Sequence, residues 1–100
     1  MRVAYRLALW TKSAIDDLNR YYDFIRLNNA DAAVHAVQAI VSSRESLQQN
    51  TRQGVIADKI AALRQLVVSF SKYGFIINYI ILKDKVVILC VYHGQENKLR

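Results

Sequence analysis

Three apolar runs dominate the second half of the chain, at 63–71, 75–82 and 86–93. Each run is rich in β-branched and aromatic residues, and the segments that separate them, KYG and KDK, have the length of hairpin connections. This pattern predicts three β-strands that form an antiparallel meander.

The first half of the chain has a different period. Residues 3–10 alternate loosely between apolar and polar side chains, which predicts a first strand. After it, apolar residues recur at steps of three and four and predict a helix that ends near Leu27. Thr11 or Ser13 can cap this helix, and Asp17 adds favourable negative charge to its first turn. The expected apolar stripe consists of Ile15, Leu18, Tyr22 and Ile25.

A break at 28–31, NNAD, is followed by a second helical pattern that starts near Ala30. The short connection predicts that the two helices are antiparallel neighbours. Residues 48–62 have no clear period and contain Gly54, so we expect a loop with at most a short turn of structure. The expected stripe of the second helix is Ala33, Val37, Ile40 and Leu47, interrupted by Arg44.

These elements predict an α+β fold: an N-terminal strand, an antiparallel helical hairpin and then a three-stranded antiparallel meander. A chain of 100 residues is large enough for one hydrophobic core but too small for two, so we expect a single domain spanning 1–100.

Both faces of the predicted meander are apolar. In the last strand one alternating set is Val86, Ile88, Cys90 and Tyr92, and the other is Val87, Leu89, Val91 and His93. The two helices can cover only one face, so we expect an uncovered apolar patch rimmed by Lys and Arg, which is typical of a partner surface. Alternatively, the sheet curls and packs its second face against its own loop and first strand.

The formal net charge of +6 is concentrated in the second half of the chain. Residues 51–100 hold eight Lys or Arg against three Asp or Glu, whereas residues 1–50 hold six against five. This excess favours an acidic partner, either a nucleic acid or an acidic protein segment. A merely solubilising basic face is the alternative.

Several classes of function find no support in the composition. No apolar run approaches the roughly 18 residues that span a bilayer, and the N-terminus is unlike a signal peptide, so a cytoplasmic protein is expected. The lone Cys90 suits a packed, reduced thiol. His35 and His93 lack further ligands at metal-binding spacing, so we expect no metal site and no cofactor.

The order of the elements, together with LRQLVV (63–68), YGFIINYII (73–81) and VVILCVYHG (86–94), resembles the RelE/ParE superfamily of type II toxin–antitoxin modules. The resemblance covers nearly the whole chain. The segment at 12–18 is also similar to the Ala-x-x-Asp-Leu pattern of the family, supplied here by Ala14, Asp17 and Leu18. The resemblance implies a toxin of the kind encoded in plasmid-stabilisation modules, with a cognate acidic antitoxin as its partner.

The superfamily contains ribosome-dependent mRNA endonucleases and ParE-like proteins that poison DNA gyrase. RNA cleavage needs a base, an acid and cations that stabilise the charge on the phosphate. Ile76 stands where the nucleases resembling this chain have an arginine, and Glu96 stands where they have a second one. The chain also has no counterpart of their C-terminal tyrosine. The departures favour the ParE-like branch, a non-enzymatic toxin that binds a protein such as gyrase. The ParE-like branch itself commonly has arginines after the closing His-Gly, where this chain has Gln95 and Glu96.

Two alternatives stay open: an mRNA interferase that acts on the ribosome, and a non-toxic domain that only binds the antitoxin. The interferase would rely on Arg64, Tyr79 and His93 as its catalytic candidates. A histidine at the end of an apolar strand is also typical of a structural cap, and the tyrosines of a meander are often core residues. The candidate partner-binding residues are Arg64, Tyr92, His93, Gln95, Glu96 and Leu99.

Overall fold

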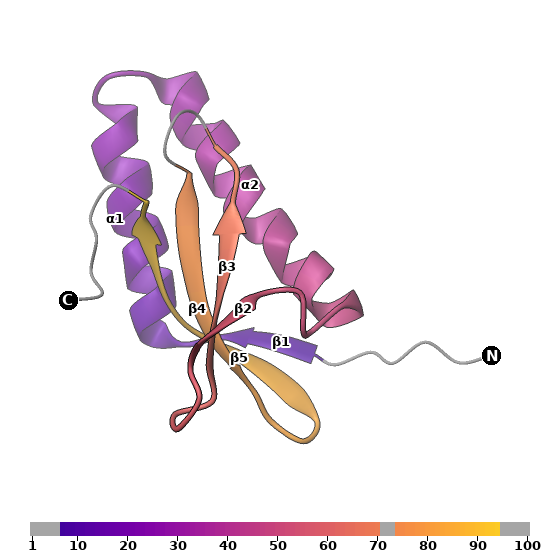
Figure 1. The fold of residues 1–100 in the computed structure, drawn as a ribbon. Helices are drawn as coiled ribbons and strands as arrows, with labels where there is room; N and C mark the ends of the chain where they lie inside the picture. The colour runs from indigo at the N-terminus through magenta and orange to yellow at the C-terminus, as the bar shows by residue number, and fades with distance from the viewer. Residues whose placement is uncertain (1–6, 71–73, 95–100) are drawn as a thin grey trace.

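The computed structural model of the protein describes residues 7–70 and 74–94, and in this part of the chain the predicted α+β fold is confirmed. A central sheet has the strand order β1-β5-β4-β3-β2, with β1 parallel to β5 and all other neighbours antiparallel (Figure 1). The elements are β1 (Leu7–Trp10), α1 (Lys12–Arg26), α2 (Ala30–Gln49), β2 (Val55–Asp58), β3 (Leu63–Val68), β4 (Phe75–Ile81) and β5 (Lys85–His93).

Strand β2 was not predicted, and the expectation of a loop over 48–62 was wrong in this part. β2 pairs with β3 at the edge of the sheet, and all four of its residues are exposed. A short edge strand with no buried face has no alternation of apolar and polar residues, so periodicity cannot reveal it.

The helices begin where the sequence places their caps. The Thr11 hydroxyl accepts a hydrogen bond from Ala14 N and the Asn29 side chain accepts one from Ala32 N, so each satisfies a free N–H of the first turn. Thr11 is therefore the cap of α1, and Ser13 lies inside the helix.

The buried stripe of α1 is rotated from the predicted one. Ile15 is 45% exposed, whereas Ala14 is fully buried. The small Ala14 side chain therefore occupies a core position near the start of the helix. The residues that pack against the core are Ala14, Leu18, Tyr21 and Ile25.

A β-bulge in β5 changes the predicted alternation of that strand. Asn78 pairs with Cys90 but Tyr79 pairs with Ile88, so Leu89 is an extra residue. The bulge moves Val91 and His93 onto the face that carries Val86 and Ile88, and moves Cys90 and Tyr92 onto the opposite one. The prediction of two uninterrupted alternating sets was therefore wrong beyond Ile88.

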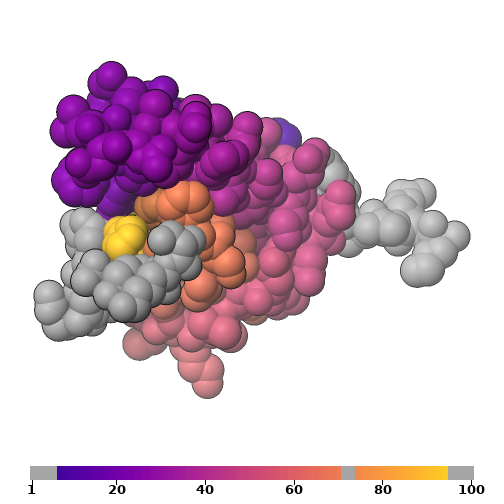
Figure 2. Space-filling view, turned by 90° about the horizontal axis from the view of Figure 1, so that it is seen from above, coloured from indigo at the N-terminus to yellow at the C-terminus, as the bar shows by residue number. Residues whose placement is uncertain are grey.

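The helical hairpin covers one face of the sheet (Figures 1 and 2). Beneath it lies the core, whose largest fully buried side chains are Tyr79, Phe75, Ile40, Leu47, Ile77, Ile88, Val86 and Val91. On the opposite side, which we call the open face, register and alternation place Leu7, Leu9, Val55, Leu63, Val67, Ile80 and Val87. Leu7 and Val67 are 48% and 67% exposed, so among the described residues the predicted uncovered apolar face is present.

Candidate partner-binding surface

Arg64 and Tyr79 lie opposite each other on β3 and β4, on the face that carries the hairpin. Arg64 Nη1 donates hydrogen bonds to Gly54 O at 2.7 Å and to Arg52 O at 3.2 Å. The Tyr79 hydroxyl donates to Thr51 O at 2.8 Å and accepts from Gly54 N at 2.9 Å. Both side chains therefore hold the loop between α2 and β2 against the sheet.

Gly54 makes this contact possible. A Cβ atom at this position would lie 2.6 Å from Gln65 O and 2.7 Å from the Tyr79 hydroxyl, too close for any other residue without a shift of the backbone. Burial raises the pKa of Tyr79 above its usual value of 10.0, and the hydrogen bond from Gly54 and the charge of Arg64 oppose this rise only in part. The hydroxyl is therefore neutral at physiological pH.

His93 lies at the other end of the same face. His93 on β5 pairs with Phe75 on β4, and the two rings meet edge to face with 5.6 Å between their centroids. Its backbone N donates to the Tyr21 hydroxyl at 2.8 Å. Phe75 and Tyr79 are four residues apart on one strand, which separates His93 from the Arg64–Tyr79 pair by about 13 Å.

The fold thus brings Arg64 and Tyr79 together but does not bring His93 to them. Tyr92 lies on the open face, where its hydroxyl accepts a 2.9 Å hydrogen bond from Gln65 Nε2. Burial, followed by the neighbouring Cys90, raises the pKa of Tyr92, while the hydrogen bonds from Gln65 and Asn78 lower it by less. The remaining candidates, Gln95, Glu96 and Leu99, lie outside the described residues.

The charges separate between the two layers. Residues 7–50, which form β1 and the hairpin, hold four Lys or Arg and five Asp or Glu. The described residues after 50, which form the rest of the sheet, hold five Lys or Arg and two Asp or Glu. Three of the hairpin cations lie close to acids of their own helix, in the pairs Lys12–Asp16, Arg20–Asp17 and Arg26–Asp23. The sheet layer therefore carries the positive field.

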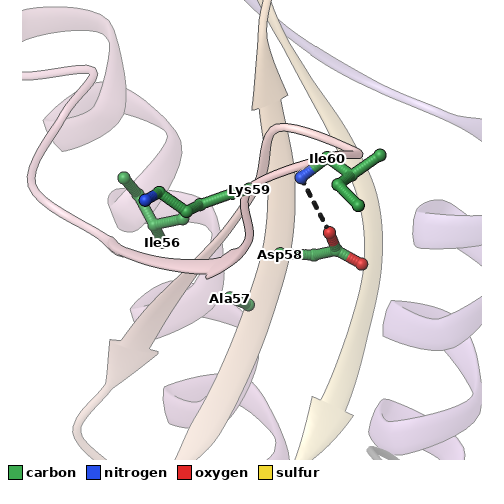
Figure 3. Close-up of a pocket in the computed structure, with 5 residues that line it drawn as sticks. All are labelled: Ile56, Ala57, Asp58, Lys59 and Ile60. Atoms are coloured by element: carbon green, nitrogen blue, oxygen red, sulfur yellow. Dashed lines mark hydrogen bonds between the residues drawn. The ribbon is translucent and has the colours of Figure 1, made fainter.

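A shallow hollow lies at the turn between β2 and β3, and it was not predicted (Figure 3). The Asp58 carboxylate accepts hydrogen bonds from Ile60 N at 3.0 Å and from Ala61 N at 3.2 Å, which fixes the turn. Ala62 has φ of 56°, in the left-handed region. The turn holds the Ile60 side chain fully exposed.

The described part of the chain holds neither a metal-binding cluster nor a helix that could span a membrane. Among residues 7–70 and 74–94, no group of three His, Cys, Asp or Glu side chains is placed to hold a metal ion. None of the helices in these ranges is both long and apolar enough to cross a bilayer.

A helical hairpin on one face of a mixed five-stranded sheet, with the other face apolar and the sheet layer basic, defines a small α+β protein with an exposed apolar face of the kind typical of partner surfaces. The sequence model described as "ParE toxin of type II toxin-antitoxin system, parDE" matches residues 8–98. The chain therefore belongs to the ParE toxin family and is a toxin component of a type II toxin–antitoxin system.

Individual relatives place the chain among the RelE/ParE toxins of type II systems. Toxin RelE3 of Caulobacter vibrioides is 36% identical over 73 residues, which cover 72% of this chain and 77% of that protein. The solved structure "Chromosomal ParDE TA system from P. aeruginosa" is similar with a TM-score of 0.74 and 26% identity, over 92% of this chain and 98% of that one. Both the family and its fold imply an antitoxin as partner.

Proposed function

We propose that this toxin acts by binding a protein target, DNA gyrase, and not by cleaving RNA. The observation that carries the proposal is the separation of the candidate catalytic groups. His93 lies about 13 Å along the sheet from Arg64 and Tyr79. An acid–base group and the cation that it works with must both reach one phosphate.

The hydrogen bonds that Arg64 and Tyr79 make to the backbone support the same proposal. Arg64 Nη1 is bound to two backbone carbonyls, and the fully buried Tyr79 hydroxyl is bound to the backbone on both sides. Ile76, where the related nucleases have an arginine, lies on the open face and supplies no charge there.

The acidic antitoxin is proposed to cover the open face. The exposed apolar residues of this face give the antitoxin a surface to bury, and the excess of cations in the sheet layer gives it a complementary field. Lys85 stands at the end of this face, in register with Leu7.

The test compares two assays on the purified toxin: DNA supercoiling by gyrase, and mRNA cleavage on translating ribosomes. We expect inhibition of supercoiling, relieved by the antitoxin, and no cleavage of mRNA above background. The control variant His93→Gln should retain inhibition of gyrase, provided that its melting temperature is that of the wild type.

The second candidate function, an mRNA interferase, is favoured by the 36% identity to a toxin named RelE3. Cleavage at defined codons that is lost in His93→Gln would establish this function and overturn the gyrase proposal. A chain that binds its antitoxin but is inactive in both assays and does not inhibit growth would be a non-toxic antitoxin-binding domain.

A further inference from the structure

A polar cluster lies in the middle of the apolar open face. Gln65 on β3, Asn78 on β4 and Cys90 on β5 stand in register across three strands, and Tyr92 lies two residues further along β5. Gln65 Nε2 donates to the Tyr92 hydroxyl at 2.9 Å, and Asn78 Nδ2 lies 3.4 Å from Cys90 Sγ. Asn78 is only 8% exposed although helices cover the other face of its strand.

One end of the Asn78 amide has no partner. Its Oδ1 atom is buried and accepts no hydrogen bond within the part of the chain that the structure describes. In this orientation of the amide, Nδ2 faces Cys90 Sγ and Oδ1 is the unpaired atom. The neighbours on the same face of β4 are Ile76 and Ile80, so a branched apolar residue would fit the pattern at 78 and avoid the cost of an unpaired buried atom.

We propose that Asn78 is the polar recognition point of the open face, where the acidic antitoxin segment that covers this face donates an N–H or O–H hydrogen bond to Asn78 Oδ1. The inference rests on the proposed binding of the antitoxin to this face. A polar group in an otherwise apolar interface selects one register, because every shifted register leaves the group buried and unpaired. Asn78 thus lowers the stability of the free toxin and sets the register of its partner.

We expect the covering segment to reach Asn78 by displacing the Gln65 side chain, which is hydrogen-bonded to Tyr92. The bond from Gln65 to Tyr92 runs from β3 to β5 across the intervening strand at Asn78. Gln65 is half-buried and has an unbranched side chain that can adopt other rotamers. An acidic segment binds this position more tightly than a second copy of the chain, because two copies bring the cations of both sheet layers together. Self-association through the open face is therefore expected only at high concentration.

The experiment measures binding of the antitoxin encoded by the adjoining gene to the full-length toxin by isothermal titration calorimetry. Asn78→Leu should weaken binding at least tenfold, while its melting temperature equals or exceeds that of the wild type. The matched control is Asn19→Leu, which makes the same replacement at an exposed position of α1 and should leave the affinity within twofold.

Undiminished binding by Asn78→Leu beside a wild type that binds would overturn this inference and leave the proposed antitoxin surface standing. A wild type that does not bind would overturn both. If Asn78→Leu does not fold, the side-chain amide resonances of Asn78 in the wild type decide. They should shift and exchange more slowly with solvent in the complex, and unchanged resonances would overturn the inference.

Discussion

Tyr79 illustrates how a single buried hydroxyl can organise a loop. It is fully buried, and its oxygen bridges Thr51 O and Gly54 N, two groups of a loop that joins the helical layer to the sheet. Arg64 adds two further bonds to the same loop. These contacts join residues 10 to 28 positions apart, so they connect the α2–β2 loop directly to the middle of the meander.

We expect Tyr79→Phe to lower the free energy of unfolding by about 1–3 kcal/mol at neutral pH, because it removes the hydrogen bond to Thr51 O and the acceptor of the buried Gly54 N–H. The measurement is urea denaturation followed by circular dichroism. Tyr22→Phe, which removes a hydroxyl from the partly exposed surface of α1, is the control and should change the free energy by less than about 0.5 kcal/mol.

The stabilities of the wild type and of Tyr79→Phe should depend differently on pH. The pKa of Tyr79 is raised in the folded state, so the folded protein retains a proton that the unfolded chain loses near pH 10. The stabilisation is complete below pH 10 and is lost as the pH rises through the folded-state pKa. Wild-type stability should therefore fall more steeply above pH 10 than that of Tyr79→Phe, and parallel curves would contradict this assignment.

At the scale of elements, side chains of the helices complete the hydrogen bonding of the sheet. Beyond the last residue of β1, Asp17 Oδ2 accepts a bond from Val91 N at 2.9 Å and the Tyr21 hydroxyl accepts one from His93 N. The Thr11 hydroxyl lies between the carbonyl oxygens of Ile88 and Leu89 at the bulge. Helix α1 therefore takes the place of a neighbouring strand along the second half of β5.

Helix α2 does the same for the outer edge of β1. Arg44 Nε donates to Ala8 O at 2.8 Å, and Ala8 N donates to Gln48 Oε1 at 2.9 Å. The charged residue that interrupts the apolar stripe of α2 thus has a structural role. Both helices protect exposed strand edges, which otherwise favour pairing between chains.

We expect Asp17→Ala to destabilise the fold by about 1–3 kcal/mol, because it removes the acceptor of a part-buried backbone N–H. Asp16→Ala, one residue earlier, breaks only the exposed pair with Lys12 and should cost at most about 0.5 kcal/mol. Thermal denaturation of both variants provides the comparison. Equal melting temperatures would show that Asp17 does not stabilise β5.

For the whole molecule, the two layers present different surfaces. The hairpin neutralises most of its own charge, whereas the sheet layer exposes apolar residues on its open face and holds an excess of cations. An apolar face without its partner favours self-association, and burial of that face by the antitoxin removes the cause.

The free toxin is therefore expected to self-associate at high concentration. Val67→Lys, on the open face, should shift sedimentation velocity profiles towards the monomer without lowering the melting temperature. Val34→Lys, at an exposed position of α2, adds the same charge to the other layer and should leave the profile unchanged. A wild type that stays monomeric at all concentrations would contradict the role assigned to the open face.

The sequence by itself determined the elements whose signals are local. The break at 28–31, the start of α2 near Ala30 and the strands β3, β4 and β5 follow from residues within a few positions of each other, and the structure has them where they were expected. For α1 the sequence left Thr11 and Ser13 open as caps, and the structure decides for Thr11. Both faces of the meander are apolar, and the two helices can cover only one of them. This was also sufficient to predict an open face.

Only the tertiary structure decided how these elements are aligned and which polar groups meet. The phase of α1 is seen only in its packing, which buries Ala14 in the core, and the bulge at Leu89 accompanies contacts with Thr11 from 77 and 78 positions earlier. The bonds of Arg64 and Tyr79 to one loop and the unpaired oxygen of Asn78 likewise arise from register between distant segments. Periodicity carries no information about such pairings, because it reports which face a residue occupies and not what lies across from it.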